Sequence, residues 1–184
     1  MKKVLFTLLF ISFFATSAFS KQCTTCEKTN DFYFITKILM TTPQSHEHDG
    51  ATLESGVGAG FGLDFGYMFA EHFALEVDFS YDNNEVTENS ATIGEDAYYL
   101  TYAVDVTYSL HVTHALGLMF KVGYELEQEI IKTLHIDLFE TGIVYGIGVE
   151  YAFTKQYEIV TEYEHSNIES TRGQSYYVGF KYNF

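Results

Sequence analysis

The sequence predicts an all-β fold, an eight-stranded antiparallel up-and-down transmembrane β-barrel, and three observations support this. First, large apolar residues alternate with small or polar ones through eight segments, which is the period of a β-strand. Second, short and long connections alternate along the chain. Third, the chain holds 15 tyrosines and 17 phenylalanines in 184 residues, and most of them fall on one face of the predicted strands.

The eight predicted strands are separated by turn-like segments. The clearest strand is 56–69, where Phe61, Leu63 and Phe65 alternate with Gly62 and Asp64. A Gly-rich segment of this kind is not a phosphate-binding loop, because no helix follows it. The strands are expected near 31–40, 56–69, 73–82, 97–110, 115–127, 138–153, 157–165 and 175–184.

The connections predict how the strands are arranged. Those near 70–72, 111–114 and 154–156 are short, those near 41–55, 83–96 and 128–137 are long, and 166–174 is intermediate. Short turns at one rim and longer loops at the other are typical of outer-membrane barrels. An even number of strands then puts both termini on the periplasmic side.

Two arrangements of the faces fit the alternation. The large apolar face could line a cavity, as in a soluble lipid-carrying barrel, or it could face lipid. The interior of an eight-stranded barrel is just wide enough for side chains to fill it, so some two dozen aromatic rings do not fit there. Aromatic residues also gather toward both strand ends, with aliphatic residues such as Val77, Val104 and Ile147 between them. Two aromatic girdles around an aliphatic band favour the lipid-facing arrangement.

The first residues have the pattern of a secretory signal peptide. Lys2 and Lys3 precede an apolar run over 4–15, and small residues follow at 18–20, so we expect cleavage after residue 20. Residues 21–30 are then a periplasmic segment that carries Cys23 and Cys26, followed by the barrel at 31–184. A local disulfide or two free thiols is expected for this pair, since a redox site needs a βαβ context and a zinc site needs two more ligands.

Composition excludes some classes of protein. The chain has 25 acidic against 10 basic residues and a formal net charge of −15, so the basic surface of a nucleic-acid-binding protein is absent. Its high aromatic content separates it from acidic disordered proteins. Beyond the signal peptide the sequence has no apolar run long enough for a transmembrane helix.

The last strand, which ends in Tyr182 and Phe184, resembles the C-terminal signal of outer-membrane barrels. With the signal peptide and the eight strands, residues 31–184 resemble the small outer-membrane β-barrel superfamily of OmpA transmembrane-domain and OmpX-like proteins, also called porin-like. This resemblance implies a place in the bacterial outer membrane and usually no enzymatic activity. It also implies contact with membrane lipid and lipopolysaccharide, and insertion by the barrel-assembly machinery. No cofactor is expected, and a monomer is favoured.

The inward face carries the most informative chemistry. Counting residues from the short-turn rim predicts a middle level, a level nearer that rim, and an outer mouth. Lys37–Asp64 and Lys121–Asp105 ion pairs are expected, because a buried charge persists only when it is paired. The middle level comprises Lys37, Asp64, Asp78, Asp105, Lys121 and Glu162; the lower one Glu76, Glu150 and Lys181; and the mouth Glu125, Glu140 and Glu164.

This network has two functional interpretations. It either fills a closed lumen, giving a structural barrel, or it lines a narrow cation-preferring path, since rings of carboxylates favour cations. A third hypothesis is adhesion or another binding role of the acidic loops 41–55 and 83–96.

Two other motifs do not predict a site. His165-Ser166-Asn167 is similar to the His-x-Ser-Asn motif of outer-membrane lipid A deacylases, but adjacent residues of a strand point to opposite faces, so base and nucleophile would not meet. His46 and His48 could contact a surface metal if the loop is extended, but exposed loop histidines are commoner and no metal site is predicted.

Overall fold

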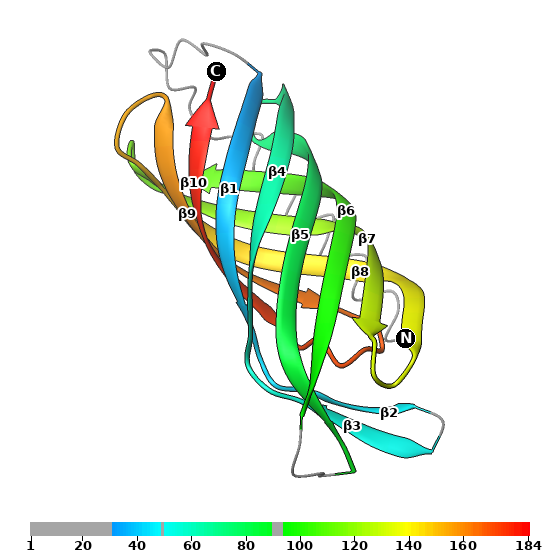
Figure 1. Ribbon diagram of the computed structural model, residues 1–184. Helices are drawn as coiled ribbons and strands as arrows, with labels where there is room; N and C mark the ends of the chain where they lie inside the picture. The colour runs from blue at the N-terminus through cyan, green and yellow to red at the C-terminus, as the bar shows by residue number, and fades with distance from the viewer. Residues whose placement is uncertain (1–30, 49, 90–93) are drawn as a thin grey trace, which may run out of the picture.

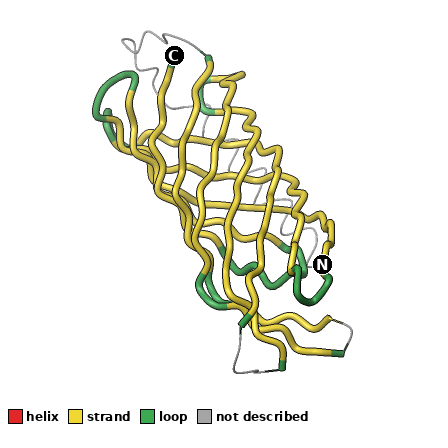
Figure 2. The backbone as a smooth tube through the Cα atoms, viewed as in Figure 1, coloured by secondary structure: helices red, strands yellow, loops and turns green. Residues whose placement is uncertain are grey.

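The computed structural model describes residues 31–48, 50–89 and 94–184. The expected signal peptide at 1–20 and the segment with Cys23 and Cys26 lie outside these residues. Within them, no helix is long and apolar enough to cross a membrane. The described chain consists of antiparallel strands joined by turns and loops at the two ends of a cylinder (Figure 2).

Eight strands close the barrel and two more form a hairpin outside it (Figure 1). Around the barrel the order is β1, β4, β5, β6, β7, β8, β9 and β10, and β10 pairs with β1 to close the ring. The predicted eight-stranded antiparallel barrel is therefore confirmed. The strands are β1 (Phe32–Thr41), β2 (Ser45–His48), β3 (Ala51–Ser55), β4 (Gly58–Ala70), β5 (Phe73–Glu88), β6 (Glu95–His111), β7 (Leu116–Ile131), β8 (Ile136–Ala152), β9 (Tyr157–Ser166) and β10 (Ser175–Asn183).

The two ends of the barrel differ. At the short-turn rim, tight connections join β4 to β5, β6 to β7 and β8 to β9, and the C-terminus lies there as well. At the long-loop rim, β5, β6, β7 and β8 extend well past β1, β9 and β10. The hairpin β2–β3 adds to this taller side, because β3 pairs with β5 from Leu53 to Ser55.

The predicted long loops 41–55, 83–96 and 128–137 are therefore partly wrong. β5 runs to Glu88, β6 begins at Glu95, and β7 runs to Ile131, while β2 and β3 occupy most of 41–55. The reason is chemical: in this region the outward positions are polar as well as many of the inward ones, as at Asn83 and Glu85. The alternation of apolar and polar residues fades there although the backbone stays extended.

Alternate side chains point outward and inward. Phe65 is 61% exposed on the outer face, whereas Lys37 is 3% exposed in the lumen. Rings of neighbouring strands contact one another at the short-turn rim, as between Phe73 and Tyr108, with centroids 5.0 Å apart, and toward the other end, as between Phe61 and Tyr81 at 5.7 Å. The barrel thus has an apolar exterior and a charged core, the reverse of a soluble protein.

A small apolar cluster closes part of the lumen at the long-loop rim. Its buried members come from the tall strands and from the hairpin, and Leu134 and Leu138 pack against it. The cluster consists of Leu53, Val86, Ala97, Tyr99, Ile131 and Ile136. Sequence analysis did not predict it, because these residues lie mostly in the segments expected to be loops.

Candidate functional site

The lumen is the candidate site, because almost all of the buried charge of the described residues lies there. Every second residue of each barrel strand points inward, and long charged side chains face glycines and small residues across the strand pairs. The buried cations are Lys37, Lys121, Arg172 and Lys181; the buried acids are Asp64, Glu76, Asp78, Asp82, Asp105, Glu125, Glu127, Glu129, Glu150, Glu162 and Glu164.

Lys37 anchors the middle of the lumen from β1. Its Nζ lies 3.0 Å from Asp64 on the adjacent strand β4 and 2.6 Å from Asp78 on β5. The ring of Tyr177 covers the same ammonium, with Nζ 4.1 Å from the ring centroid. The contact with Asp78 is a charge-assisted hydrogen bond, which is the strong kind, and the contact with Asp64 is an ion pair.

Lys121 on β7 reaches several carboxylates at once. Its Nζ lies 2.8 Å from Glu164 and 2.9 Å from Glu162, both on β9, and 3.4 Å from Glu76 on β5. Strands β5 and β9 stand on opposite sides of the eight-membered ring. One ammonium therefore connects two opposite walls across the lumen.

Lys181 organises the level nearest the short-turn rim. Its Nζ lies 2.7 Å from Glu150 and 3.4 Å from Glu158, and it sits 4.3 Å from the ring centroid of Tyr33. The hydroxyl of Tyr33 donates a hydrogen bond to Glu76. Glu76, which was expected at this lower level, also lies 3.4 Å from Lys121, so Tyr33 and Glu76 together connect the lower level to the middle one.

Arg172 closes the long-loop end of the lumen, and sequence analysis missed it. It lies in the connection 167–174, which folds inward and buries Thr171 and Arg172. The guanidinium lies 2.9 Å from Asp82, 3.4 Å from Glu127 and 3.6 Å from Glu125. The available signal was that this is the only arginine of the chain.

A polar cap lies beside Arg172. The hydroxyls of Tyr99 and Thr171 share a hydrogen bond, and Thr171 also donates one to Glu129. The Tyr99 hydroxyl lies 3.3 Å from the side-chain oxygen of Asn84. Together with the apolar cluster above it, this cap fixes the inward-folded connection against β5, β6 and β7.

The structure brings the nine predicted lumen residues together, with one difference from the expected pairing and two from the expected position of the mouth acids. Lys121 is 4.0 Å from Asp105, farther than its contacts with Glu162 and Glu164, so the predicted Lys121–Asp105 pair is its most distant carboxylate contact. Glu164 belongs to the middle level and not to the mouth, because strand tilt and the long lysine side chain bring it to Lys121. Glu140 is only half-buried.

The other motifs of the sequence do not form a site. The ring of His165 packs on the outer face against Tyr145, at 5.0 Å between centroids, whereas Ser166 Oγ accepts a hydrogen bond from the backbone of Ile168 at 3.4 Å. His46 and His48 lie on the outer hairpin strand β2. Across the part of the chain that the structure describes, no group of three or more His, Cys, Asp or Glu residues could hold a metal ion.

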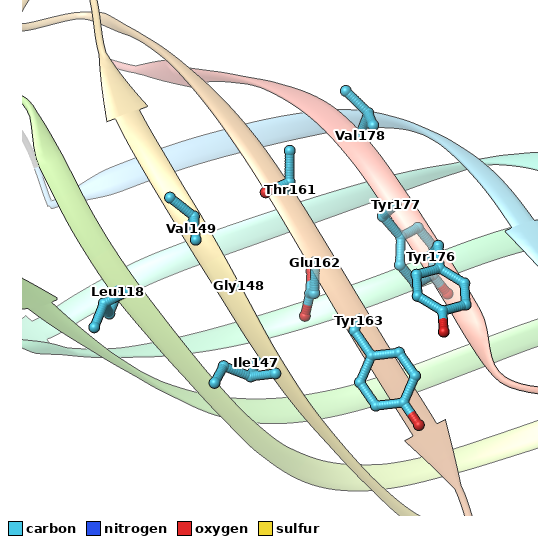
Figure 3. A pocket seen from close by; sticks show the side chains of 10 residues that line it. All are labelled: Leu118, Ile147, Gly148, Val149, Thr161, Glu162, Tyr163, Tyr176, Tyr177 and Val178. Atoms are coloured by element: carbon cyan, nitrogen blue, oxygen red, sulfur yellow. The ribbon is translucent and has the colours of Figure 1, made fainter.

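The wall between β8, β9 and β10 has a depression of about 500 Å³ (Figure 3). Its apolar lining includes Ile147, Val149 and Val178, and Thr161 is the small outward side chain among them. Glu162 and Tyr177 also border it, and both are buried. A shallow, mostly apolar depression of this kind offers no convergent polar groups for catalysis.

A closed antiparallel barrel with an apolar exterior and a charged lumen defines the class of integral outer-membrane β-barrel proteins. The model of the family described as outer membrane protein beta-barrel domain matches residues 6–184, and the chain belongs to this family. The protein is thus located in the bacterial outer membrane, as the resemblance implied. No curated protein sequence matches the chain.

Solved structures show the same fold at low sequence identity. The outer membrane protein OprG from Pseudomonas aeruginosa is 14% identical, with a TM-score of 0.66 over 85% of this chain and 97% of that one. Neisserial surface protein A is 18% identical, with a TM-score of 0.58 over 84% and 97%. Ail, the attachment invasion locus protein of Yersinia pestis, is 16% identical, with a TM-score of 0.55 over 85% and 100%.

Proposed function

We propose that this protein is a non-enzymatic structural barrel of the outer membrane whose lumen is closed by its own charged side chains. The observation that carries the proposal is the position of Lys121, which contacts carboxylates on the opposite strands β5 and β9 at 3.4 and 2.8 Å. An ammonium held in this way occupies the centre of the narrow interior, where a solute would have to pass.

Two further contacts support a closed lumen. Above Lys121, Arg172 joins Asp82 of β5 to Glu127 of β7. Below it, Lys181 joins Glu150 of β8 to Glu158 of β9. A porin-like path would have to separate ion pairs at three levels, and breaking one buried pair costs about 3–5 kcal/mol.

Planar-bilayer recording tests this proposal. The refolded protein should give no steady unitary current in potassium chloride, whereas the variant Arg172→Ala/Lys121→Ala, if it folds, should give brief openings. Insertion of the wild-type protein into the bilayer should be verified by its resistance to added protease. A steady cation-selective current from the wild-type barrel would overturn the closed-lumen proposal and favour the porin-like alternative.

Surface binding is a second candidate, and the tall side of the barrel favours it. The hairpin β2–β3 and the ends of β5 and β6 extend beyond the rest of the rim (Figure 1). Similarity in fold to a protein named for attachment and invasion is compatible with such a role. The hairpin and its neighbours carry Glu47, Glu54, Glu85, Glu88, Glu95 and Asp96, so a basic partner surface is expected.

Replacing residues 45–55 with a short Gly-Ser linker tests surface binding. If the hairpin is the contact site, bacteria that produce the variant should lose attachment to a surface that wild-type cells bind, while the barrel still resists protease. A charge-matched control keeps the hairpin and removes three acids elsewhere at the long-loop rim, Asp137→Asn/Glu140→Gln/Glu169→Gln. Equal attachment of all three strains would remove the hypothesis.

The orientation in the membrane is part of the proposal. We place the short-turn rim and both termini in the periplasm, after removal of a signal peptide at 1–20, and favour a monomer inserted by the barrel-assembly machinery. In a Cys23→Ser/Cys26→Ser background, Glu88→Cys should react with an impermeant maleimide on intact cells, and Lys155→Cys should react only after lysis. The opposite labelling would reverse the orientation.

A further inference from the structure

Strand β8 extends past the end of its neighbour β9 at the long-loop rim (Figure 1). It pairs with β7 from Ile136 onward, but its pairing with β9 begins only at Val144. The connection 167–174 that follows β9 turns into the lumen instead of continuing along β8. Residues 136–142, the open edge of β8, therefore have no strand partner on the side of β9 among the described residues.

The direction of the backbone groups at this edge follows from two hydrogen bonds of Ile143. Its N–H donates to the side-chain oxygen of Asn167 at 2.6 Å, and its carbonyl accepts from the N–H of Asn167 at 3.1 Å. Both groups of Ile143 thus point to the side of β9. Alternate residues of a strand in an antiparallel pair present their backbone groups to the same side, so those of Asp137, Phe139 and Thr141 point there as well. No described group bonds to them on that side.

The open edge of β8 lies in water. Asp137, Phe139 and Thr141 are exposed, and backbone groups without partners do not occur in the hydrocarbon of a membrane. In the orientation proposed above, this edge therefore stands outside the cell. Sheets usually protect such an edge with proline, with lysine or with a covering loop, and 136–142 contains neither proline nor lysine.

The charge around the open edge of β8 is negative. Asp137 and Glu140 lie on the strand itself, and Glu95 on β6 accepts a hydrogen bond from Thr133 in the turn before β8. Lys132 is the only lysine or arginine between 132 and 143. A second copy of the chain would bring the same acids together, and a lipid phosphate would be repelled as well. A basic partner is the complementary one.

We propose that the open edge of β8 accepts an extended, basic segment of a partner protein as an additional strand. Main-chain hydrogen bonds to Asp137, Phe139 and Thr141 would supply affinity, and lysine or arginine side chains of the segment would favour the acids of the edge. At the rise of a strand, the open edge is roughly 23 Å long, which accommodates a strand of ordinary length. This surface is separate from the hairpin β2–β3 and does not depend on whether the lumen is closed.

Peptide binding tests the edge. The full chain is refolded in micelles of a non-ionic detergent, where both rims are accessible, so the result does not depend on the orientation in the membrane. The probe is a short, fluorescent peptide of alternating valine and lysine, and its binding is followed by anisotropy against empty micelles. The same peptide with every amide nitrogen methylated keeps the charge but cannot form a strand pair, and it should not bind. Equal binding of the two peptides, or binding of neither, would overturn the proposal.

Two variants locate the binding. Phe139→Pro/Thr141→Pro removes two N–H groups of the edge that take no part in the pairing with β7, and proline is tolerated at such positions. Phe139→Ala/Thr141→Ala is the matched control, because it loses the same side chains and keeps the N–H groups. The proline variant should bind the peptide about tenfold or more weakly than the alanine variant, and equal affinities would contradict docking at this edge.

Amide exchange of the wild-type barrel gives a test that needs no variant to fold. When the valine-lysine peptide is bound, hydrogen exchange followed by NMR should slow at the amides of Asp137, Phe139 and Thr141. Protection that appears on the hairpin β2–β3 instead, with the β8 amides unchanged, would overturn the proposal.

Discussion

The ring of Tyr33 lies directly over Gly66, its partner in register across the β1–β4 pair. A Cβ at residue 66 would come within 2.0 Å of the ring carbon Cζ of Tyr33. The glycine is what allows this ring to lie against the wall while its hydroxyl reaches Glu76 and its face covers Lys181. One missing methyl group therefore positions a side chain that contacts two charged groups of the lumen.

Gly66→Ala should destabilise the barrel by about 1–3 kcal/mol, because the Tyr33 ring must move and give up its contacts. Urea unfolding in lipid vesicles measures the change in the free energy of unfolding. It can be followed by tyrosine fluorescence, since the chain has no tryptophan, or by gel mobility. Gly117→Ala is the matched control. The nearest atom to its Cβ would be Oε2 at the flexible end of Glu150, at 3.3 Å, and the next ones lie at ordinary van der Waals distances. An equal loss of stability there would contradict the argument.

Lys121→Ala should cost about 3–5 kcal/mol, since it leaves Glu162, Glu164 and Glu76 without their shared ammonium. The free energy of unfolding measures the loss. Lys132→Ala removes an exposed lysine near the long-loop rim and should cost less than about 1 kcal/mol. Similar values for the two variants would mean that the lumen is wet enough to screen its charges.

Arg172→Ala should loosen the connection 167–174. Without the contacts to Asp82 and Glu127, amide hydrogens of this segment should exchange faster, while those of β4 and β5 stay protected. Arg172→Lys should restore little of the protection, because a single ammonium cannot reproduce the several contacts of the planar guanidinium. Mass-spectrometric hydrogen exchange measures this, and full protection in the lysine variant would contradict it.

Val77→Lys tests which face meets lipid. Val77 is 53% exposed on the outer face of β5, and a lysine at mid-membrane depth in a barrel should cost about 2–4 kcal/mol. Asn83→Lys, outward on the same strand but near the long-loop rim, should cost about 0–1 kcal/mol. Equal costs at the two depths would place Val77 outside the hydrocarbon.

The sequence predicts the barrel well wherever lipid imposes a period of two. Around Phe61 and Val77 the outward residues are apolar and the inward ones are not, so strand and face follow together. Beyond that zone the outward residues of β5, such as Asn83 and Glu85, are polar, while the inward ones are mixed. The alternation fades there, and the sequence predicts loops where the structure has strands. The hairpin β2–β3 had its own signal in Asp49-Gly50, a turn pair, and Gly50 has a φ of 81°.

The sequence predicts which charged residues lie in the lumen better than it predicts which of them form ion pairs. Alternation alone puts Lys37 and Asp64 inside, and they lie 3.0 Å apart. The partners of Lys121 depend on the stagger between strands that are not neighbours, which a single sequence does not specify. Arg172 comes from a connection rather than a strand, so no periodicity pointed to its inward direction.

The ion pairs of Lys121 with Glu76 on β5 and with Glu164 on β9 also affect how easily the barrel deforms. A ring of strands held only by ladder hydrogen bonds can be squeezed into an ellipse by uneven lateral pressure from surrounding lipid. Ion pairs that join opposite strands across the lumen resist that flattening. The cross-sectional shape of this barrel should therefore change little between thin and thick bilayers.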